Sequence, residues 1–283
     1  MTTPLPTPAS QVLIAAPGTG DGWWAGAPTA VHDPAGGLVV AWRERHGHDG
    51  FDVNVIARSG DGGATVTEVL RVDARHFGAR WIERPALVPL AGGGWRLYVC
   101  LGREGTKMWD IAAVDAPALE ALGDGPAIPT LAYDDLTAVK DPIVTRDGDR
   151  WRAWVCCHLL DIPGAEDRMR TAHAVSADGL RWEYEGIVLE GAPGSWDQRG
   201  ARLTALLPDG TAAYDGRATA DENWFERLGI ATPDAAGRFA PAPAPVADIR
   251  YLTSLDVAGG TRIWWEQRTP DGSHELRTEL LPG

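Results

Sequence analysis

The chain repeats one short pattern at a fixed interval. Pro28, Pro85 and Pro142 are separated by 57 residues each time. Each proline is followed by a short apolar segment, a turn rich in Gly or Asp, and a second apolar segment that carries Trp. A repeat of this size, with strands and turns inside each unit, is typical of a radial array of small β-sheets.

Two further units follow the three that carry the proline. The sequence therefore predicts an all-β fold, a five-bladed β-propeller, with blades starting near residues 26, 83, 140, 199 and 250. All-β chains of 283 residues often form one domain, so we expect a single domain over 1–283. The last unit shows three clear strands, and a strand-like run at 11–16 precedes the first unit. Pairing this N-terminal strand into the last blade would close the propeller and remove exposed edges.

The net charge of -13 and the pI of about 4.9 exclude two classes of partner. Nucleic acids and anionic membranes are both bound by basic surfaces. No apolar run is long enough to span a membrane, and residues 1–10 lack the features of a signal peptide. The three cysteines, two of them adjacent, fit buried thiols better than disulfides. We therefore expect a cytoplasmic protein, a monomer or small homo-oligomer, without nucleic-acid or membrane partners.

Charged residues gather at the predicted starts of the innermost strands. In a propeller these starts meet at the mouth of the central funnel, which would bring together Glu83, Arg84, Lys140 and Asp141 with residues of the last two units. A mixed ring of acids and bases is costly to bury without a partner, so it is a natural ligand site. The alternative is a solvated channel lined by salt bridges.

Two motifs carry a resemblance to a known group of proteins. The first is Lys140-Asp141-Pro142, and the second is Trp196–Arg202 together with Ala213–Gly216. The chain resembles the five-bladed β-propeller glycoside hydrolases of families 43 and 32, and the mannoside phosphorylases of family 130. The resemblance implies a carbohydrate-active enzyme that cleaves glycosidic bonds in the central funnel.

The sequence departs from the family 43 pattern at two catalytic positions. Ala27 stands where that family has an Asp as general base, and Arg199 is the best match to its general acid. Glu83 opens blade two, where family 43 is usually not acidic. A glycoside phosphorylase and a non-catalytic carbohydrate-binding propeller therefore remain as alternatives to a hydrolase.

Glycoside hydrolysis needs a protonated acid at the leaving oxygen and a carboxylate that activates water or attacks directly. The candidate catalytic residues are Glu83, Asp141, Asp197 and Asp215; each could instead form an ion pair or cap a turn. Most of the 13 Trp residues should fill blade interfaces, and a few should stack on sugars. The candidate substrate-binding residues are Trp24, Trp81, Arg84, Lys140, His158, Arg199, Arg202, Arg250 and Tyr251.

The candidate site holds more bases than acids. Because arginines are most often offset by paired hydrogen bonds to carboxylate or phosphate, we expect a small carbohydrate substrate that is anionic or is cleaved with phosphate. A neutral substrate is the alternative, with the arginines only positioning the acids. No cluster has the spacing of a metal site and no Gly-rich phosphate loop precedes a helix, so the sequence predicts no metal and no cofactor.

Overall fold

The computed structural model describes residues 3–48 and 50–283. This part of the chain is all-β apart from two short 3-10 helices, η1 (Ala74–Phe77) and η2 (Leu119–Ala121). None of its helical segments has the length and hydropathy needed to cross a bilayer.

The strands follow one another in five antiparallel sets within the described residues. The first set contains β2 (Trp23–His32), β3 (Leu38–His46), β4 (Val53–Ser59) and β5 (Thr67–Asp73). The second contains β6 (Trp81–Ile82), β7 (Ala86–Pro89), β8 (Trp95–Gly102), β9 (Trp109–Ala116) and β10 (Ile128–Leu131). The third contains β11 (Thr137–Asp147), β12 (Arg150–Leu159), β13 (Met169–Ser176) and β14 (Glu183–Leu189).

The last two sets complete the chain. The fourth contains β15 (Gly200–Leu206), β16 (Ala212–Arg217), β17 (Arg227–Pro233) and β18 (Phe239–Ala240). The fifth contains β19 (Arg250–Val257), β20 (Gly260–Arg268) and β21 (His274–Pro282). The strand predicted at 11–16 is present as β1 (Gln11–Ile14) and pairs with β21 in antiparallel fashion, so the two ends of the chain share one sheet.

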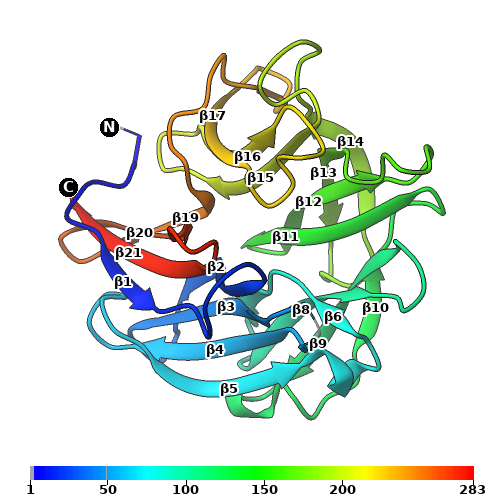
Figure 1. The fold of residues 1–283 in the computed structure, drawn as a ribbon. Helices are drawn as coiled ribbons and strands as arrows, with labels where there is room; N and C mark the ends of the chain where they lie inside the picture. Colours follow the sequence, from blue (N-terminus) through cyan, green and yellow to red (C-terminus); the bar gives the residue numbers. More distant parts are fainter. Residues whose placement is uncertain (1–2, 49) are drawn as a thin grey trace.

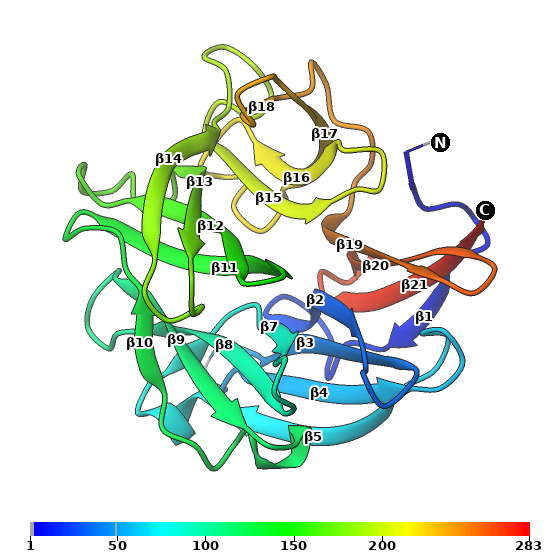
Figure 2. The same cartoon turned by 180° about the vertical axis from the view of Figure 1, so that it is seen from behind.

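The sets are arranged around a common centre (Figure 1). One strand of each set lies innermost: β2, β7, β11, β15 and β19 all approach the middle of the molecule (Figure 2). Single parallel bridges, Trp24 with His274 and Met169 with Gly200, join the fifth set to the first and the third to the fourth. The residues at the starts of the inner strands therefore converge.

Five clusters of buried hydrophobic residues lie between neighbouring sets. One joins the first and second sets through Val39 and Leu97, and another joins the fifth and first sets through Trp264 and Trp42. Trp154 of β12 packs in the cluster with Tyr214 of β16. Several of the tryptophans thus fill interfaces between sets, as the sequence predicted for most of them.

Three of the inner strands, β2, β11 and β19, share one backbone irregularity. Strand pairing skips from Gly26 to Thr29 in β2, from Lys140 to Ile143 in β11, and from Arg250 to Thr253 in β19. The first residue skipped is in each case left-handed: Ala27 (φ 51°), Asp141 (φ 53°) and Tyr251 (φ 53°). Such a bulge changes the direction of the side chain and is found near functional sites. The second set has a break between β6 and β7 at the equivalent point of the 57-residue repeat. The repeat therefore coincides with an irregular backbone in each of the first three sets.

Candidate active site

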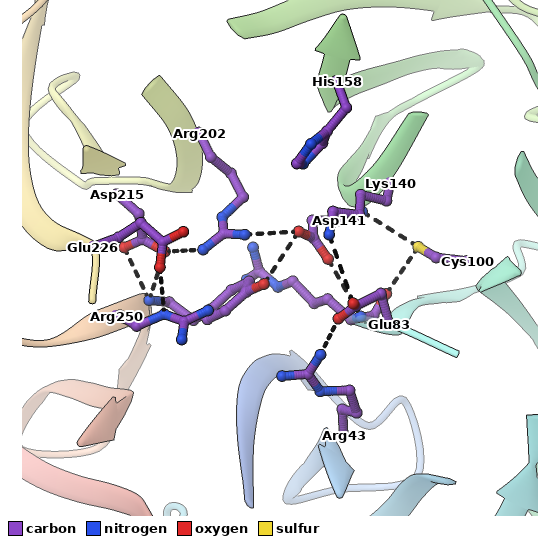
Figure 3. A network of polar contacts seen from close by, with 12 residues as sticks. Arg43, Glu83, Cys100, Lys140, Asp141, His158, Arg202, Asp215, Glu226 and Arg250 are labelled. Carbon is purple, nitrogen blue, oxygen red and sulfur yellow. Dashed lines mark hydrogen bonds and ion pairs between the residues drawn. The ribbon is translucent and has the colours of Figure 1, made fainter. Parts of the chain in front are cut away.

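Ten charged side chains come together at the starts of the inner strands, most of them almost fully buried. Figure 3 shows most of this group from close by. This charged ring consists of the acids Glu83, Asp141, Asp215, Glu226 and Glu266 and the bases Arg43, Lys140, Arg202, Arg217 and Arg250. Ion pairs link acids and bases in two groups: one consists of Asp141, Arg202 and Asp215, and the other contains the remaining seven residues. Because isolated charges are costly to bury, the ring depends on this mutual pairing.

Glu83 lies between three bases. Its carboxylate accepts a hydrogen bond from Arg43, and its Oε1 lies 3.6 Å from Lys140 Nζ and 3.7 Å from Arg45 Nη2. Asn54 Nδ2 donates to the Glu83 carbonyl oxygen at 2.9 Å and fixes the backbone there. Burial by itself would raise the pKa of Glu83, but the neighbouring cations outweigh it and hold the pKa below its ordinary value. Glu83 is therefore an ionised carboxylate at neutral pH.

Arg202 connects Asp141 of the third set to Asp215 of the fourth. Its Nη1 lies 3.0 Å from Asp141 Oδ2, and its Nη2 lies 2.7 Å from Asp215 Oδ2. Tyr251 supports the group, because its hydroxyl donates to Asp141 Oδ2 at 3.2 Å and its ring lies 3.9 Å from the Arg202 guanidinium carbon. Burial raises the pKa of Asp215 to about 6 against the opposing effect of Arg202 and Arg250. Asp215 is thus only partly ionised in mildly acidic solution.

Two acids of the ring were not among the residues predicted from sequence. Arg250 lies between them, with Nε 3.1 Å from Glu226 Oε2 and Nη1 3.3 Å from Glu266 Oε1. A Cβ at Gly26 would overlap the Glu266 carboxylate, so the glycine of the first repeat unit provides room for this acid. Glu266 lies inside β20 and Glu226 in the segment before β17, whereas sequence reasoning examined the starts of inner strands.

A small inner cavity of about 20 Å³ lies in the ring, where Glu83, Glu226, Trp24 and Lys140 are among the lining residues. An outer hollow of about 270 Å³ shares Lys140 and His158 with it and is also lined by Lys107, Trp109, Glu166 and Asp167. Asn223 and Trp224 line both spaces and so separate them.

The segment 221–224, which carries Asn223 and Trp224, forms a cover between the inner cavity and the outer hollow. Contacts of Trp224 hold this cover in place. It has a left-handed backbone (φ 75°), and its carbonyl oxygen accepts a hydrogen bond from Arg250 Nη1 at 2.9 Å. Its indole meets Trp24 edge to face, with ring centroids 5.2 Å apart. Both Asn223 and Trp224 lie in the turns that the chain forms at 221–224.

His158 is a neutral hydrogen-bond acceptor that faces the inner cavity (Figure 3). Its Nδ1 lies 3.1 Å from the Glu166 carbonyl oxygen, so Nδ1 carries the proton and donates it there. Nε2 is buried and has no hydrogen-bond partner among the described residues. Burial, with Lys140 and Arg217 nearby, lowers the pKa of His158 well below its ordinary value. The free lone pair on Nε2 is therefore available to a ligand hydroxyl.

Of the residues predicted from sequence, Trp24, Glu83, Lys140, His158, Arg202, Arg250 and Tyr251 line the inner cavity. Asp141 and Asp215 lie directly behind it, on either side of Arg202. These side chains come from all five sets, so the tertiary structure brings together what the sequence places far apart.

The other predicted residues lie elsewhere. Asp197 accepts hydrogen bonds from Ser195 and, at 2.7 Å, from the Tyr214 hydroxyl, and it lines neither space. Arg199 pairs with Asp167 at 2.7 Å, while Trp81 stacks with Arg80 at 4.9 Å. Arg84 turns away from the ring, and its guanidinium donates to the Pro28 carbonyl oxygen.

In the described part of the chain, no group of three or more His, Cys, Asp or Glu side chains is placed so that it could hold a metal ion. The three cysteines are free and buried, as predicted. The side chains present offer hydrogen bonds, charge and aromatic surface to a ligand.

Comparisons with known proteins identify the fold but give no sequence relative. No family model matches the chain, and no curated protein matches it. A thermostable family-43 glycoside hydrolase superposes with a TM-score of 0.68 at 12% identity, over 92% of this chain and 90% of that one. The beta-1,2-mannobiose phosphorylase of Listeria innocua gives a TM-score of 0.63 at 12% identity, over 99% of this chain and 92% of that one.

A third solved structure, the GH43_1 enzyme from Xanthomonas citri complexed with xylotriose, gives a TM-score of 0.65 at 14% identity, covering 96% of this chain and 90% of that one. At these identities the likeness concerns the fold alone. The resemblance noted from the two motifs is confirmed at this level: the chain has the all-β, propeller-like fold shared by glycoside hydrolases of family 43 and mannoside phosphorylases.

Proposed function

We propose that the five strand sets are the blades of one five-bladed propeller over residues 1–283, closed where β1 joins β21. Two observations support this proposal. A hydrophobic cluster lies at each interface between successive sets, including the one between the fifth and the first. β1 adds a fourth strand to the fifth set, which then has as many strands as the first, third and fourth sets.

Deletion of residues 1–16 tests the closure. Without β1 the edge of β21 is exposed, so we expect the melting temperature to fall by about 5 °C or more, measured by calorimetry. A control chain that lacks only residues 1–3 should melt like the full chain. Equal melting of the two shortened chains would contradict the proposed closure.

We propose that the protein is an enzyme that cleaves glycosidic bonds. In this proposal the sugar occupies the outer hollow, and the scissile bond meets the charged ring below it. The observation that carries the proposal is that two carboxylates from different sets, Glu83 and Glu226, line one cavity directly beneath a hollow walled by Trp109 and Trp224. Two acids at one pocket are what glycoside cleavage requires, and Trp side chains provide stacking surfaces for sugars.

The chemistry assigns different tasks to the groups. Glu83, held ionised by its cations, is suited to activate water or to attack the anomeric carbon. Arg250 and Arg217 also overcome the effect of burial on Glu226 and lower its pKa, so a proton must be taken up before an acid can protonate the leaving oxygen. If Glu226 is that acid, we expect the cleavage rate to be highest in acidic solution and to fall before the pH reaches neutrality, because Glu226 loses its proton below the ordinary pKa of a Glu. His158 Nε2 and Lys140 would bind sugar hydroxyls.

The cover over the inner cavity must move in this mechanism. A space of about 20 Å³ holds about one water molecule, whereas a sugar ring is far larger. Displacement of Trp224 would join the inner cavity to the outer hollow, because this residue lines both. Closure of such loops over a bound substrate commonly excludes water and completes a catalytic site.

A screen of nitrophenyl glycosides and oligosaccharides, with and without phosphate, tests the proposed activity. Glu83→Gln should lower kcat on any substrate found by about 100-fold or more, since the carboxylate that drives the reaction is lost. Glu190→Gln changes an exposed Glu remote from the ring and should leave kcat unchanged. Full turnover by Glu83→Gln would instead favour Asp141, Asp215 or Glu226 as the essential acid.

The sequence expectation of an anionic partner is carried into this proposal. The inner cavity is lined by five bases, Arg43, Lys140, Arg202, Arg217 and Arg250, against the two acids Glu83 and Glu226. Such a lining favours a carboxylate on the sugar or phosphate as co-substrate. Arg202→Ala should weaken an anionic ligand much more than a neutral sugar. Ready cleavage of neutral pentosides, insensitive to phosphate and salt, would contradict an anionic partner.

A non-catalytic carbohydrate-binding protein is the second candidate. It is favoured by the cover over the inner cavity and by the pairing of every acid of the ring with a base. In that case sugars would bind in the outer hollow and no product would form. Binding measured by calorimetry without any cleavage in the screen would support this alternative.

A further inference from the structure

A second, larger cavity lies at the opposite ends of the inner strands. It has a volume of about 630 Å³ and is lined mainly by residues of β2, β7, β11, β15 and β19. Most of its wall is apolar, formed by residues such as Val31, Leu87, Val144, Leu206 and Leu255. We call this space the apolar channel. Its size lies in the range typical of small-molecule binding sites.

Arg84 lies at the inner end of the apolar channel. Its Nε and Nη2 both donate to the Pro28 carbonyl oxygen, at 3.0 and 2.8 Å. Its Nη1 is buried and has no hydrogen-bond partner among the described residues. Within the same residues no carboxylate lies within ion-pair distance of this guanidinium, in contrast to Arg43, Arg202 and Arg250 of the ring.

A buried arginine without an acid partner is an unusual feature. The side chain is only 2% exposed, and burial lowers its pKa. A buried cation is costly unless an anion and further hydrogen bonds offset it. The arginines of the ring are in direct contact with acids. The Arg84 guanidinium has one backbone carbonyl as its hydrogen-bond acceptor, and Asp141 and Asp215 favour its charge only from beyond ion-pair distance.

We propose that the apolar channel is a second binding site, which takes a linear amphipathic carboxylate with its apolar chain along the channel and its carboxylate at Arg84. This inference is independent of the proposed glycosidase activity, because it concerns the other end of the inner strands. The free Nη1 would donate to the carboxylate, and the buried charge would be paired. Burial of the chain against Val31, Leu87 and Val144 would contribute hydrophobic free energy.

The wall carries a few hydroxyl groups, those of Thr29, Thr145, Thr204, Thr253 and Ser254, but its mostly apolar surface favours an apolar chain over other occupants. A sugar would leave most of its hydroxyl groups without partners against an apolar wall. An inorganic anion would pair with Arg84 but would leave the channel unfilled. Arg146 also lines the channel, but it already has Asp149 at 3.9 Å and lies over the ring of Trp151, so we assign the carboxylate to Arg84.

Isothermal titration calorimetry with hexanoate, octanoate and decanoate, and with 1-hexanol and 1-octanol, tests the proposal. We expect saturable binding of the carboxylates with affinity rising about fourfold for each added methylene group until the channel is full. Each carboxylate should bind at least tenfold more tightly than the alcohol of equal length. Equal affinity of acid and alcohol, or no saturable binding at any length, would overturn the proposal.

Variants locate the site. Ser254→Trp places a large side chain in the channel from β19 without touching Arg84, and it should weaken octanoate binding at least tenfold. Thr232→Trp adds the same side chain at an exposed position of β17 and should leave binding unchanged. Wild-type affinity in Ser254→Trp would show that the ligand binds elsewhere and would overturn the proposal.

A second pair of variants separates the two cations. Arg84→Gln should abolish the preference for octanoate over octanol, whereas Arg146→Gln should retain it. The reverse result would overturn the assignment to Arg84. If Arg84→Gln does not fold, Ser254→Trp, Arg146→Gln and the comparison of acid with alcohol in the wild-type protein still decide between the outcomes.

Discussion

The two ends of the inner strands fill the centre of the molecule differently: one end is packed with charged side chains, and the other surrounds an apolar channel. At their starts, ten charged side chains fill the centre and leave a cavity of about 20 Å³. Beyond the bulges, the same strands present apolar side chains to a channel of about 630 Å³. The strands converge on one centre throughout, so the difference comes from the side chains and not from the architecture.

The physical reason lies in what each kind of side chain needs. A buried charge must have partners in contact, so Glu83 and Asp141 pair with Arg43 and Arg202 from neighbouring sets, and little space remains. Apolar side chains need no specific partner. They can line a space without loss of hydrogen bonds, and small residues such as Thr29 and Ala205 leave it wide. Arg84 stands at the boundary between the two.

The largest expected effect tests the charged end. Arg202→Met removes the cation between Asp141 and Asp215 and leaves two buried carboxylates without it, so we expect a loss of about 4 kcal/mol in the free energy of unfolding. Arg199→Met removes a partly exposed pair and should cost less than about 1 kcal/mol. Urea unfolding measures both. Similar losses in the two variants would mean that the ring is not held by mutual pairing.

A smaller effect is expected at the apolar end. Leu87 is buried and lines the apolar channel, so Leu87→Ala should cost about 3 kcal/mol through lost hydrophobic burial. No titratable group is removed, and the loss should therefore be the same at pH 5 and pH 7. A loss that changes with pH would show that the two ends are coupled.

The smallest effect is a pH dependence that only the charged end should show. The pKa of Asp215 is raised to about 6, above its unfolded value, so its destabilising contribution grows as the pH rises from about 4 to 6. Asp215→Asn removes this contribution. Between pH 4 and 7 the stability of the variant should therefore rise relative to wild type by about 2 kcal/mol. Parallel stability curves for the two proteins would contradict the raised pKa.

The sequence predicted site residues most successfully at positions that recur in the repeat units. Glu83 and Lys140 stand at equivalent points of successive units, 57 residues apart, and the structure brings both to the ring, where they form an ion pair. Asp197 and Arg199 stand in a motif that looked equivalent, yet their side chains pair with Tyr214 and Asp167 outside the inner cavity. A motif fixes the position of the backbone, while hydrogen-bond partners from other sets decide where the side chain goes.

Glu226 and Glu266 belong to the ring although the sequence did not indicate them. Neither stands at the start of an inner strand, and each joins the ring because Arg250 lies between them. Space for Glu266 depends on Gly26, which is remote in sequence and adjacent in the fold. No local pattern records such a contact, because it arises from the packing of one set against the next.

The amino-acid sequence by itself determined the strand pattern, the 57-residue repeat and the presence of an N-terminal strand that pairs near the C-terminus. These features follow from local preferences of turns and from alternating apolar residues, which act over a few positions. Only the tertiary structure decided which charges meet, that Trp224 covers the inner cavity, and that Arg84 faces an apolar channel instead of the ring. Those outcomes depend on which side chains share one buried volume, and that volume exists only after all five sets have packed together.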